Sequence, residues 1–188
     1  MKLLGTKELE TERLVLRRLK KADAEEAFNS WCNNDDVPRF LPWERHRNVD
    51  ETKALYEMWE KEYADMDTFR WIVELKSSHE LIGTIDVVDK ESIKFDVAEV
   101  GYCYGKRFWG HGYGTEALKR VIKYLFEECE AEVVCAKHYS NNPASGKIMQ
   151  KSGMHLDGIL RNRVVDKDGK RNNICCYSII REEYQKNK

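Results

Sequence analysis

The stretch that most constrains the fold of this chain is residues 107–118, RFWGHGYGTEAL, where three glycines occupy five positions directly before a good helix-forming segment. Glycine adopts positive φ at little cost and has no side chain, so an anion can approach the backbone closely. The N-terminus of a helix adds unpaired N–H groups and the positive end of a dipole. The stretch therefore predicts either an anion site or a structural turn.

Two familiar phosphate motifs do not fit this spacing. The nucleotide-triphosphate loop ends in Gly-Lys-Ser/Thr, whereas Gly114 is followed here by Thr115 and Glu116. The dinucleotide fingerprint is G-x-G-x-x-G near the start of a strand-helix-strand unit, whereas this stretch reads G-x-G-x-G in mid-chain. Spacing alone leaves the anion site and the turn as open alternatives.

Hydrophobic periodicity predicts a mixed order of strands and helices around the glycines. Strands are expected at 13–19, 71–75, 81–87, 97–107 and 131–139, with a final hairpin around Asp168-Gly169. Helices are expected at 20–33, 50–66 with Asp50 as N-cap, 115–129, and 141–153 with Asn142 as N-cap and Pro143 in the first turn. A long, aromatic-rich connection separates the first two helices. This order favours an α/β (α+β) fold with one sheet.

Composition sets the remaining limits. The 188 residues predict one domain, 1–188, and a net charge of −1 argues against nucleic-acid binding through a general electrostatic footprint. No apolar run is long enough to span a membrane, and the N-terminus does not resemble a signal peptide. The six cysteines lack metal-binding spacing, so we expect no metal and reduced thiols in a cytoplasmic protein.

The segment EVGYCYGKRFWGHGYGTEALKRVIKYLF resembles the acetyl-CoA-binding core of the GNAT superfamily of N-acetyltransferases, and the chain is most similar to its RimJ/RimL-like branch, which acetylates ribosomal-protein N-termini. TERLVLRRLKKADAEEAF, VPRFLPW, NNPASGKIMQKSGMHLDGILR and YSIIREEY extend the resemblance over nearly the whole chain. One departure is Trp109, where the superfamily usually has Gln or Arg, although Trp is frequent in this branch. The resemblance implies a single mixed, centrally splayed sheet of about seven strands with helices on both faces.

The resemblance also implies where acetyl-CoA binds. Backbone N–H groups of residues 110–115 would hold the pyrophosphate, and the strand before them would bond the pantetheine arm through its backbone. Asn142 would bind the coenzyme where the sheet opens, although a plain helix cap explains it too, and Lys147 is either a phosphate partner or a surface charge. The expected cofactor-binding residues are Tyr102, Cys103, Tyr104, Trp109, Gly110, His111, Gly112, Tyr113, Gly114, Thr115, Asn142 and Lys147.

Acetyl transfer from a thioester to an amine needs a proton acceptor for the amine and a proton donor for the leaving thiolate. Glu99 is the expected general base because a carboxylate is unusual in the apolar strand VAEVGY. Ser145 is the expected donor because it lies in the first turn of a helix, where the family pattern also has a serine. A solvent-side strand residue and a helix-terminus serine are the respective alternatives, and Tyr104, Tyr139, His111 and His138 are competing acid–base candidates.

The acceptor side is less constrained by the sequence. Phe40 and Trp43 in the long connection are expected to wall the amine pocket, or else to anchor the loop. We expect an acetyl-CoA-dependent N-acetyltransferase that acts by direct transfer on a protein or peptide N-terminal α-amine, with a ribosomal protein as one possible partner. A small-molecule amine acetyltransferase and a non-catalytic coenzyme A-binding module are the alternatives. The protein is expected to be a monomer or homodimer.

Overall fold

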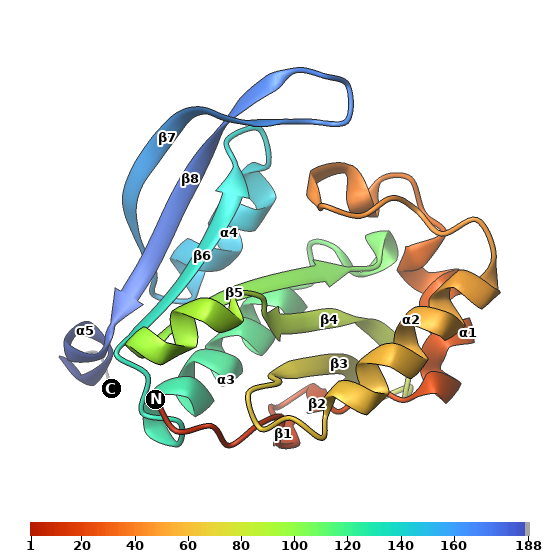
Figure 1. Ribbon diagram of the computed structural model, residues 1–188, viewed down its shortest axis with the longest axis horizontal. Helices are drawn as coiled ribbons and strands as arrows, with labels where there is room; N and C mark the ends of the chain where they lie inside the picture. The colour runs from red at the N-terminus through yellow and green to blue at the C-terminus, as the bar shows by residue number, and fades with distance from the viewer. Residues whose placement is uncertain (187–188) are drawn as a thin grey trace.

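The computed structural model describes residues 1–186, and its organising element is one eight-stranded mixed sheet (Figure 1). The strand order is β1-β2-β3-β4-β5-β6-β8-β7. All neighbouring pairs are antiparallel except β5 and β6, which are parallel. The strands are β1 (Leu9–Glu10), β2 (Leu14–Arg17), β3 (Arg70–Leu75), β4 (Leu81–Val87), β5 (Val97–Tyr104), β6 (Val133–Tyr139), β7 (His155–Val165) and β8 (Arg171–Ile180).

Helices cover both faces of this sheet (Figure 1). The α1–α2 region lies on one face, and α3 and α4 lie on the other. The α-helices are α1 (Ala24–Ala27), α2 (Val49–Glu62), α3 (Tyr113–Glu127), α4 (Pro143–Lys151) and α5 (Arg181–Lys186). Short helical turns complete the fold: η1 (Lys21–Asp23), the π-helical η2 (Phe28–Cys32), η3 (Val37–Phe40), η4 (Lys90–Phe95) and η5 (Lys106–Phe108).

Successive side chains along each strand point to opposite faces of the sheet, so the hydrophobic core consists of two clusters. Trp71 and Val73 of β3 pack with α3, whereas Ile72 between them packs with the α1–α2 side. Helix α3 buries the predicted stripe of Leu118, Val121, Ile122, Leu125 and Phe126, with Cys129 just past its end. Full burial of each large aliphatic or aromatic side chain contributes about 1.5–3 kcal/mol relative to exposure. Helix α3 is therefore fixed firmly against the sheet.

The predicted splay of the sheet lies between β5 and β6. Their parallel ladder joins only Val97–Glu99 to Val133–Cys135. Beyond this point β5 continues to pair with β4 as far as Tyr104, and β6 continues to pair with β8 as far as Tyr139. The two strands thus separate into a wedge, and the edge of β5 that faces β6 becomes available to a ligand.

The sequence-based expectations need four corrections. The sheet has eight strands rather than about seven, because the two-residue strand β1 is too short to show alternation. The N-cap of α2 is Asn48, whose side chain accepts from the Glu51 amide, and Asp50 lies inside the helix. The expected helix at 20–33 is divided into 3-10, α and π turns. Helix α5 was not expected.

Other expectations about local structure are confirmed. Asn142 caps α4, Pro143 is its first residue, and Gly153 follows the helix with a φ of +90°. The final hairpin turns at Gly169.

All six cysteines are free. Within residues 1–186, no helix combines the length and apolar character needed to cross a membrane.

Candidate active site

The glycine stretch forms a tight turn between β5 and α3. Gly110 and Gly112 have φ values of +81° and +83°, which other residues rarely adopt, and Gly112 is the N-cap of α3. Gly114 is needed for a different reason: a Cβ there would lie 2.9 Å from Ile148 Cδ1 and 3.1 Å from Tyr104 Cε2. Its lack of a side chain lets α3 approach both α4 and the end of β5.

This turn presents six consecutive backbone amides. In the described part of the chain, the amides of Gly110, His111 and Gly112 have no hydrogen-bond acceptor. The next three amides belong to the first turn of α3, which begins its bonding with Glu116 N to Gly112 O at 3.1 Å. Unpaired amides at a helix N-terminus fit a diphosphate. The residues therefore fit the pyrophosphate of coenzyme A.

Arg13, which precedes β2, holds this turn in place from 98 or more residues away in the chain. Its Nη1 donates to the carbonyl of His111 at 3.1 Å, and its Nε donates to the carboxylate of Glu116 at 2.7 Å. The guanidinium also lies 4.5 Å from the ring centre of Tyr113, on which His111 stacks. Sequence analysis missed Arg13, because no local pattern connects it to the glycines.

Trp109 braces the strand that leads into the turn. Its indole N–H donates to the carbonyl of Tyr104 at 2.7 Å, and its amide donates to the carbonyl of Lys106 at 3.2 Å. The ring remains 48% exposed. The amide of Trp109 is thus already engaged, and the free amides begin at Gly110.

Ser145 and Tyr102 meet across the wedge between β5 and β6. The phenolic oxygen of Tyr102 lies 3.0 Å from both the hydroxyl and the carbonyl oxygen of Ser145. The Ser145 amide donates to Asn142 Oδ1 at 3.4 Å, which confirms the capping role of Asn142. Burial raises the pKa of Tyr102, so its hydroxyl keeps its proton at neutral pH. Lys147, farther along α4, is exposed and has no ion pair within residues 1–186.

Glu99 lies on the other face of the sheet, where the ladder between β5 and β6 ends. Its carboxylate is bonded to Lys137 Nζ of β6 at 2.6 Å, and its side chain is 18% exposed. This hydrogen bond raises the pKa of Lys137, which therefore stays charged. Cys103 lies on the same face as Glu99, and burial raises the pKa of its thiol to about 11. Cys103 is thus a neutral thiol at physiological pH.

The competing acid–base candidates occupy packed positions. His138 Nδ1 lies 2.8 Å from the carbonyl of Tyr139, and its Nε2 is buried against Gly146 of α4. Burial raises the pKa of Tyr104 well above its usual value. These surroundings favour structural roles for His138 and Tyr104.

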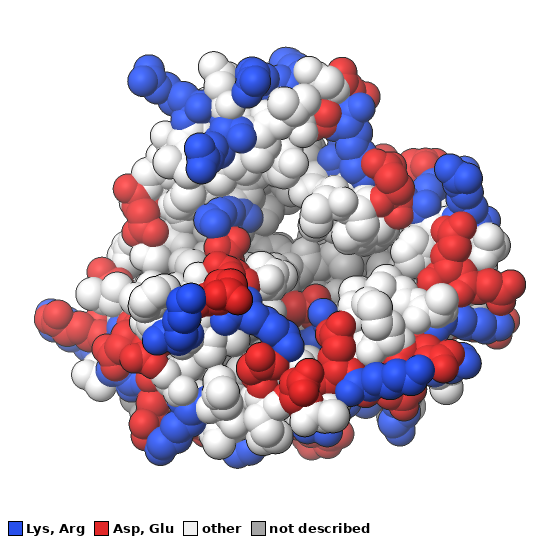
Figure 2. Space-filling model, viewed as in Figure 1, with Lys and Arg blue, Asp and Glu red and all other residues white. Residues whose placement is uncertain are grey.

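The side expected to bind the acceptor is bordered by the loop that carries η3. The rings of Phe40 and Tyr139 are 5.8 Å apart, and Lys167 Nζ of the β7–β8 turn donates to the carbonyl of Trp43 at 2.6 Å. Figure 2 shows this face hollowed between the β7–β8 side and that loop. A cavity of about 320 Å³ lies here, lined by Asp35, Pro38, Arg39, Phe40, Glu44, Arg45, Asn141, Asp166, Lys167 and Asp168. Phe40 lines this cavity, and its role as a wall of the amine pocket stays a prediction.

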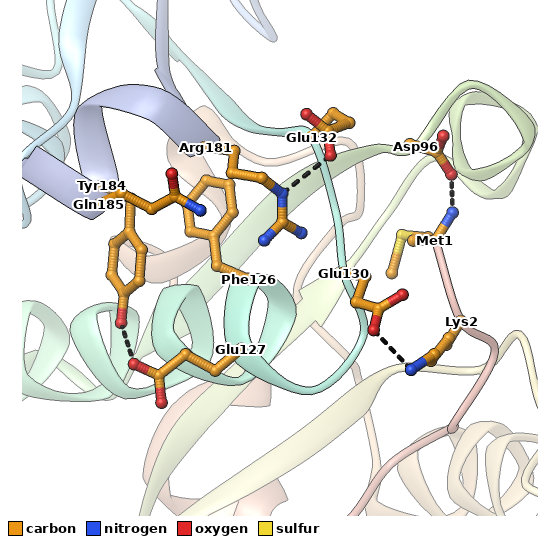
Figure 3. Close-up of a pocket in the computed structure, with 10 residues that line it drawn as sticks. All are labelled: Met1, Lys2, Asp96, Phe126, Glu127, Glu130, Glu132, Arg181, Tyr184 and Gln185. Carbon is orange, nitrogen blue, oxygen red and sulfur yellow. Dashed lines mark hydrogen bonds and ion pairs between the residues drawn. The ribbon is translucent and has the colours of Figure 1, made fainter.

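A larger pocket of about 900 Å³ lies at the opposite end of α3 (Figure 3). Its charged groups pair with one another: Arg181 with Glu132, Lys2 with Glu130, and the amino group of Met1 with Asp96. The 15 residues of α3 span about 22 Å, so this pocket is remote from the glycine turn. This pocket lies between the N-terminal segment and α5, and it is not part of the candidate site.

Comparisons with known proteins agree with this geometry. Residues 13–155 match the acetyltransferase (GNAT) domain family. YoaA of Bacillus subtilis, named an uncharacterized N-acetyltransferase, is 29% identical over 173 residues, which are 92% of this chain and 96% of YoaA.

Solved structures share the fold at low sequence identity. RimL, the ribosomal L7/L12 alpha-N-protein acetyltransferase solved with coenzyme A, has a TM-score of 0.82 at 16% identity and covers 93% of this chain and 98% of its own. The ribosomal-protein-S5-alanine acetyltransferase from Vibrio fischeri has a TM-score of 0.81 at 20% identity and covers 94% and 97%.

Proposed function

This chain belongs to the GNAT acetyltransferase family, and from this membership we propose that it acetylates the α-amine at the N-terminus of a protein or peptide. Its activity is acetyl-CoA-dependent N-acetyl transfer. RimL and the S5-alanine acetyltransferase, whose names state ribosomal-protein acceptors, support a protein acceptor, with a ribosomal protein as one candidate. A small-molecule amine is the alternative acceptor.

The observation that carries the proposal is the row of free amides at residues 110–115 beside the open wedge between β5 and β6. The amides would hold the pyrophosphate, and the free edge of β5 from Tyr102 to Tyr104 would bond the pantetheine arm as an added strand does. The thioester would then lie in the wedge between β5 and β6. Ser145 would be on one side of it, and the hollow that receives the acceptor would be on the other.

The transfer in this site forms a C–N bond and breaks a C–S bond. The amine lone pair attacks the thioester carbonyl carbon, and a backbone N–H at or beside Cys103 stabilises the developing oxyanion. The nitrogen loses one proton to a carboxylate on the acceptor face. Glu99 is the carboxylate that the sequence predicts for this role. The C–S electron pair leaves on sulfur, which takes a proton from the Ser145 hydroxyl. The Tyr102 hydroxyl, in contact with Ser145, returns a proton to the serine oxygen and regains one from solvent.

Acceptor basicity favours an α-amine. Its pKa is about 7.7–8.0, so a useful fraction is neutral near pH 7.5, whereas a lysine amine near 10.4 requires about 4 kcal/mol for deprotonation. The acceptor face offers carboxylates rather than a strong base. A carboxylate suits the weaker amine better.

An acceptor panel tests the proposal. The panel contains a lysine-free peptide with a free N-terminus, the same peptide N-formylated and carrying one lysine, a polyamine, an aminoglycoside and a free amino acid. We expect the free-α-amine peptide to give a kcat/KM at least about tenfold above the others in coenzyme A release, with Ser145→Ala as the low-activity reference. Faster turnover of the lysine peptide or of a small amine would overturn the proposed acceptor.

A further inference from the structure

Among residues 1–186, three buried polar atoms without hydrogen-bond partners lie on the face of the sheet that α1 and α2 cover, which is the proposed acceptor face. They are the hydroxyl of Tyr56 on α2, Nε of Arg70 on β3, and Oδ1 of Asp86 on β4. Buried polar atoms in folded proteins are nearly always bonded, so three orphans in one region call for an explanation. Two other orphans, in Tyr104 and His138, belong to residues whose side chains pack on the opposite, α3–α4 face.

Strand register places Asp86 beside the reacting region. Asp86 pairs with Arg70 on β3 and with Gly101 on β5. Directly paired residues in antiparallel strands share a face, so Asp86 lies on the face of Glu99 and Cys103, which flank Gly101 at two residues on either side. Thr84, two residues before Asp86, already reaches this region: its Oγ1 lies 3.4 Å from Cys103 Sγ.

Arg70 and Asp86 form an ion pair that is longer than a good hydrogen bond. Arg70 Nε and Asp86 Oδ1 are 3.7 Å apart, beyond hydrogen-bond distance. The guanidinium is held instead by Glu62, which accepts from Nη1 at 2.7 Å, and by the ring of Trp59, 4.2 Å away. Asp86 therefore has a neighbouring positive charge but a carboxylate oxygen that remains able to accept a proton. The side chain as a whole is 19% exposed, although Oδ1 itself is buried.

The surroundings of Asp86 make it the group in this cluster that changes charge near neutrality. Burial raises the pKa of Asp86 to about 7, against the opposing effect of Arg70, and Glu62 adds to the rise. The other titratable groups on this face are Tyr56 of α2, Tyr63 at the C-cap of α2 and Cys103 of β5. Burial raises the pKa of each, so all three stay neutral at pH 7.

Glu99 and Asp86 are thus held differently. The carboxylate of Glu99 is bonded to the ammonium of Lys137, whereas Oδ1 of Asp86 accepts no hydrogen bond from any residue that the structure describes. We infer that Asp86 is the carboxylate that takes the proton from the acceptor amine, an inference that rests on the proposed acetyl transfer at this site. As the C–N bond forms, the nitrogen–hydrogen bond breaks and the proton moves to the Asp86 carboxylate, which later releases it to solvent. Arg70 positions that carboxylate through the charge it holds 3.7 Å away.

Kinetics as a function of pH test this inference. The variants are Asp86→Asn, Glu99→Gln and, as a matched control, Glu91→Gln on the exposed surface of η4. We expect Asp86→Asn to lower kcat at least about 100-fold and to remove the limb near pH 7 in kcat/KM, with coenzyme A affinity unchanged, leaving only the limb near pH 8 that the acceptor α-amine itself gives. Glu99→Gln should keep that limb, and Glu91→Gln should match the parent. Loss of the limb in Glu99→Gln but not in Asp86→Asn would overturn the inference in favour of Glu99.

A measurement on the unsubstituted protein tests the inference without relying on a variant that folds correctly. Carbon-13 NMR of the aspartate carboxyls, assigned through bonded correlations, should show Asp86 titrating near pH 7, and a midpoint near 4 would overturn the inference. Turnover of a small amine instead of a peptide would overturn only the proposed acceptor, because the variants are then compared on that amine. If no amine is turned over, both proposals fail.

Discussion

The phenolic oxygen of Tyr102 lies 3.0 Å from the hydroxyl oxygen of Ser145, across the wedge where β5 and β6 separate. The two residues are 43 positions apart, and their contact spans the place expected for the thioester. In the proposed mechanism, these two hydroxyls supply the proton to the leaving thiolate.

Removing the Ser145 hydroxyl should slow the chemical step. We expect Ser145→Ala to lower kcat about 100-fold and Tyr102→Phe about tenfold, because Tyr102 acts through the serine. The double variant should be no slower than Ser145→Ala, since the two side chains act as a unit. Single-turnover release of coenzyme A measures this, and fully additive losses would show two independent roles.

Positive φ in the glycine turn should be needed for binding coenzyme A. Gly110→Ala meets no atom within 4 Å, so its effect comes from a backbone strain of about 1–2 kcal/mol. We expect coenzyme A affinity to fall about tenfold by calorimetry. Gly169→Ala is the matched control: its φ is +77°, its surroundings are equally open, and it lies in the distant β7–β8 turn. An equal loss of affinity in both variants would argue against the amide cradle.

Arg13 should pre-organise the same turn. Arg13→Ala removes the donors to His111 and Glu116, and we expect coenzyme A affinity to fall several-fold. Arg13→Lys should not restore it, because a lysine cannot reproduce the planar fork. Arg120→Ala is the control, since Arg120 also links α3 to the β1–β2 region, through the carbonyl of Glu10, but lies beyond the turn. Unchanged affinity in Arg13→Ala would show that the turn keeps its shape unaided.

Phe40 should affect the acceptor and not the acetyl donor. Phe40→Ala opens the wall next to Tyr139, so we expect the KM for the acceptor to rise about fivefold, by roughly 1 kcal/mol of lost contact, with the KM for acetyl-CoA unchanged. Phe95→Ala removes an equally large ring that is 71% exposed on η4 and should change neither constant. A rise in both constants for Phe40→Ala would indicate general disorder of the loop.

The free energy of unfolding should also depend on pH because of Asp86, and the sign of this dependence follows from its pKa. Because its pKa rises from 3.8 unfolded to about 7 folded, the folded state binds more protons between these values, and stability falls as pH rises from about 4 to 7. Asp86→Asn should therefore stabilise the protein at pH 8 by at most about 4 kcal/mol, and little at pH 4. Chemical denaturation at both pH values checks this. Equal effects at pH 4 and pH 8 would contradict a raised pKa.

Local signals in the sequence were sufficient to predict several elements of the structure. The glycine turn, the cap of α4 at Asn142 and the final hairpin all depend on residues within a few positions of one another. Capping, positive φ and periodicity act over one or two turns of chain, so the sequence shows them directly. The family resemblance supplied the splay between β5 and β6, which no local pattern indicates.

Tertiary structure alone decided which side chains meet. Tyr102 with Ser145, Arg13 with Glu116, and Asp86 with Arg70 each join segments brought together by sheet register or helix docking. The sequence likewise placed the N-cap of α2 two residues late. Whether a carboxylate is bonded to lysine, as in Glu99, or buried without a donor, as in Asp86, depends on groups far away in the chain. Burial and long-range pairing set the free energy of a charge, and both exist only after folding.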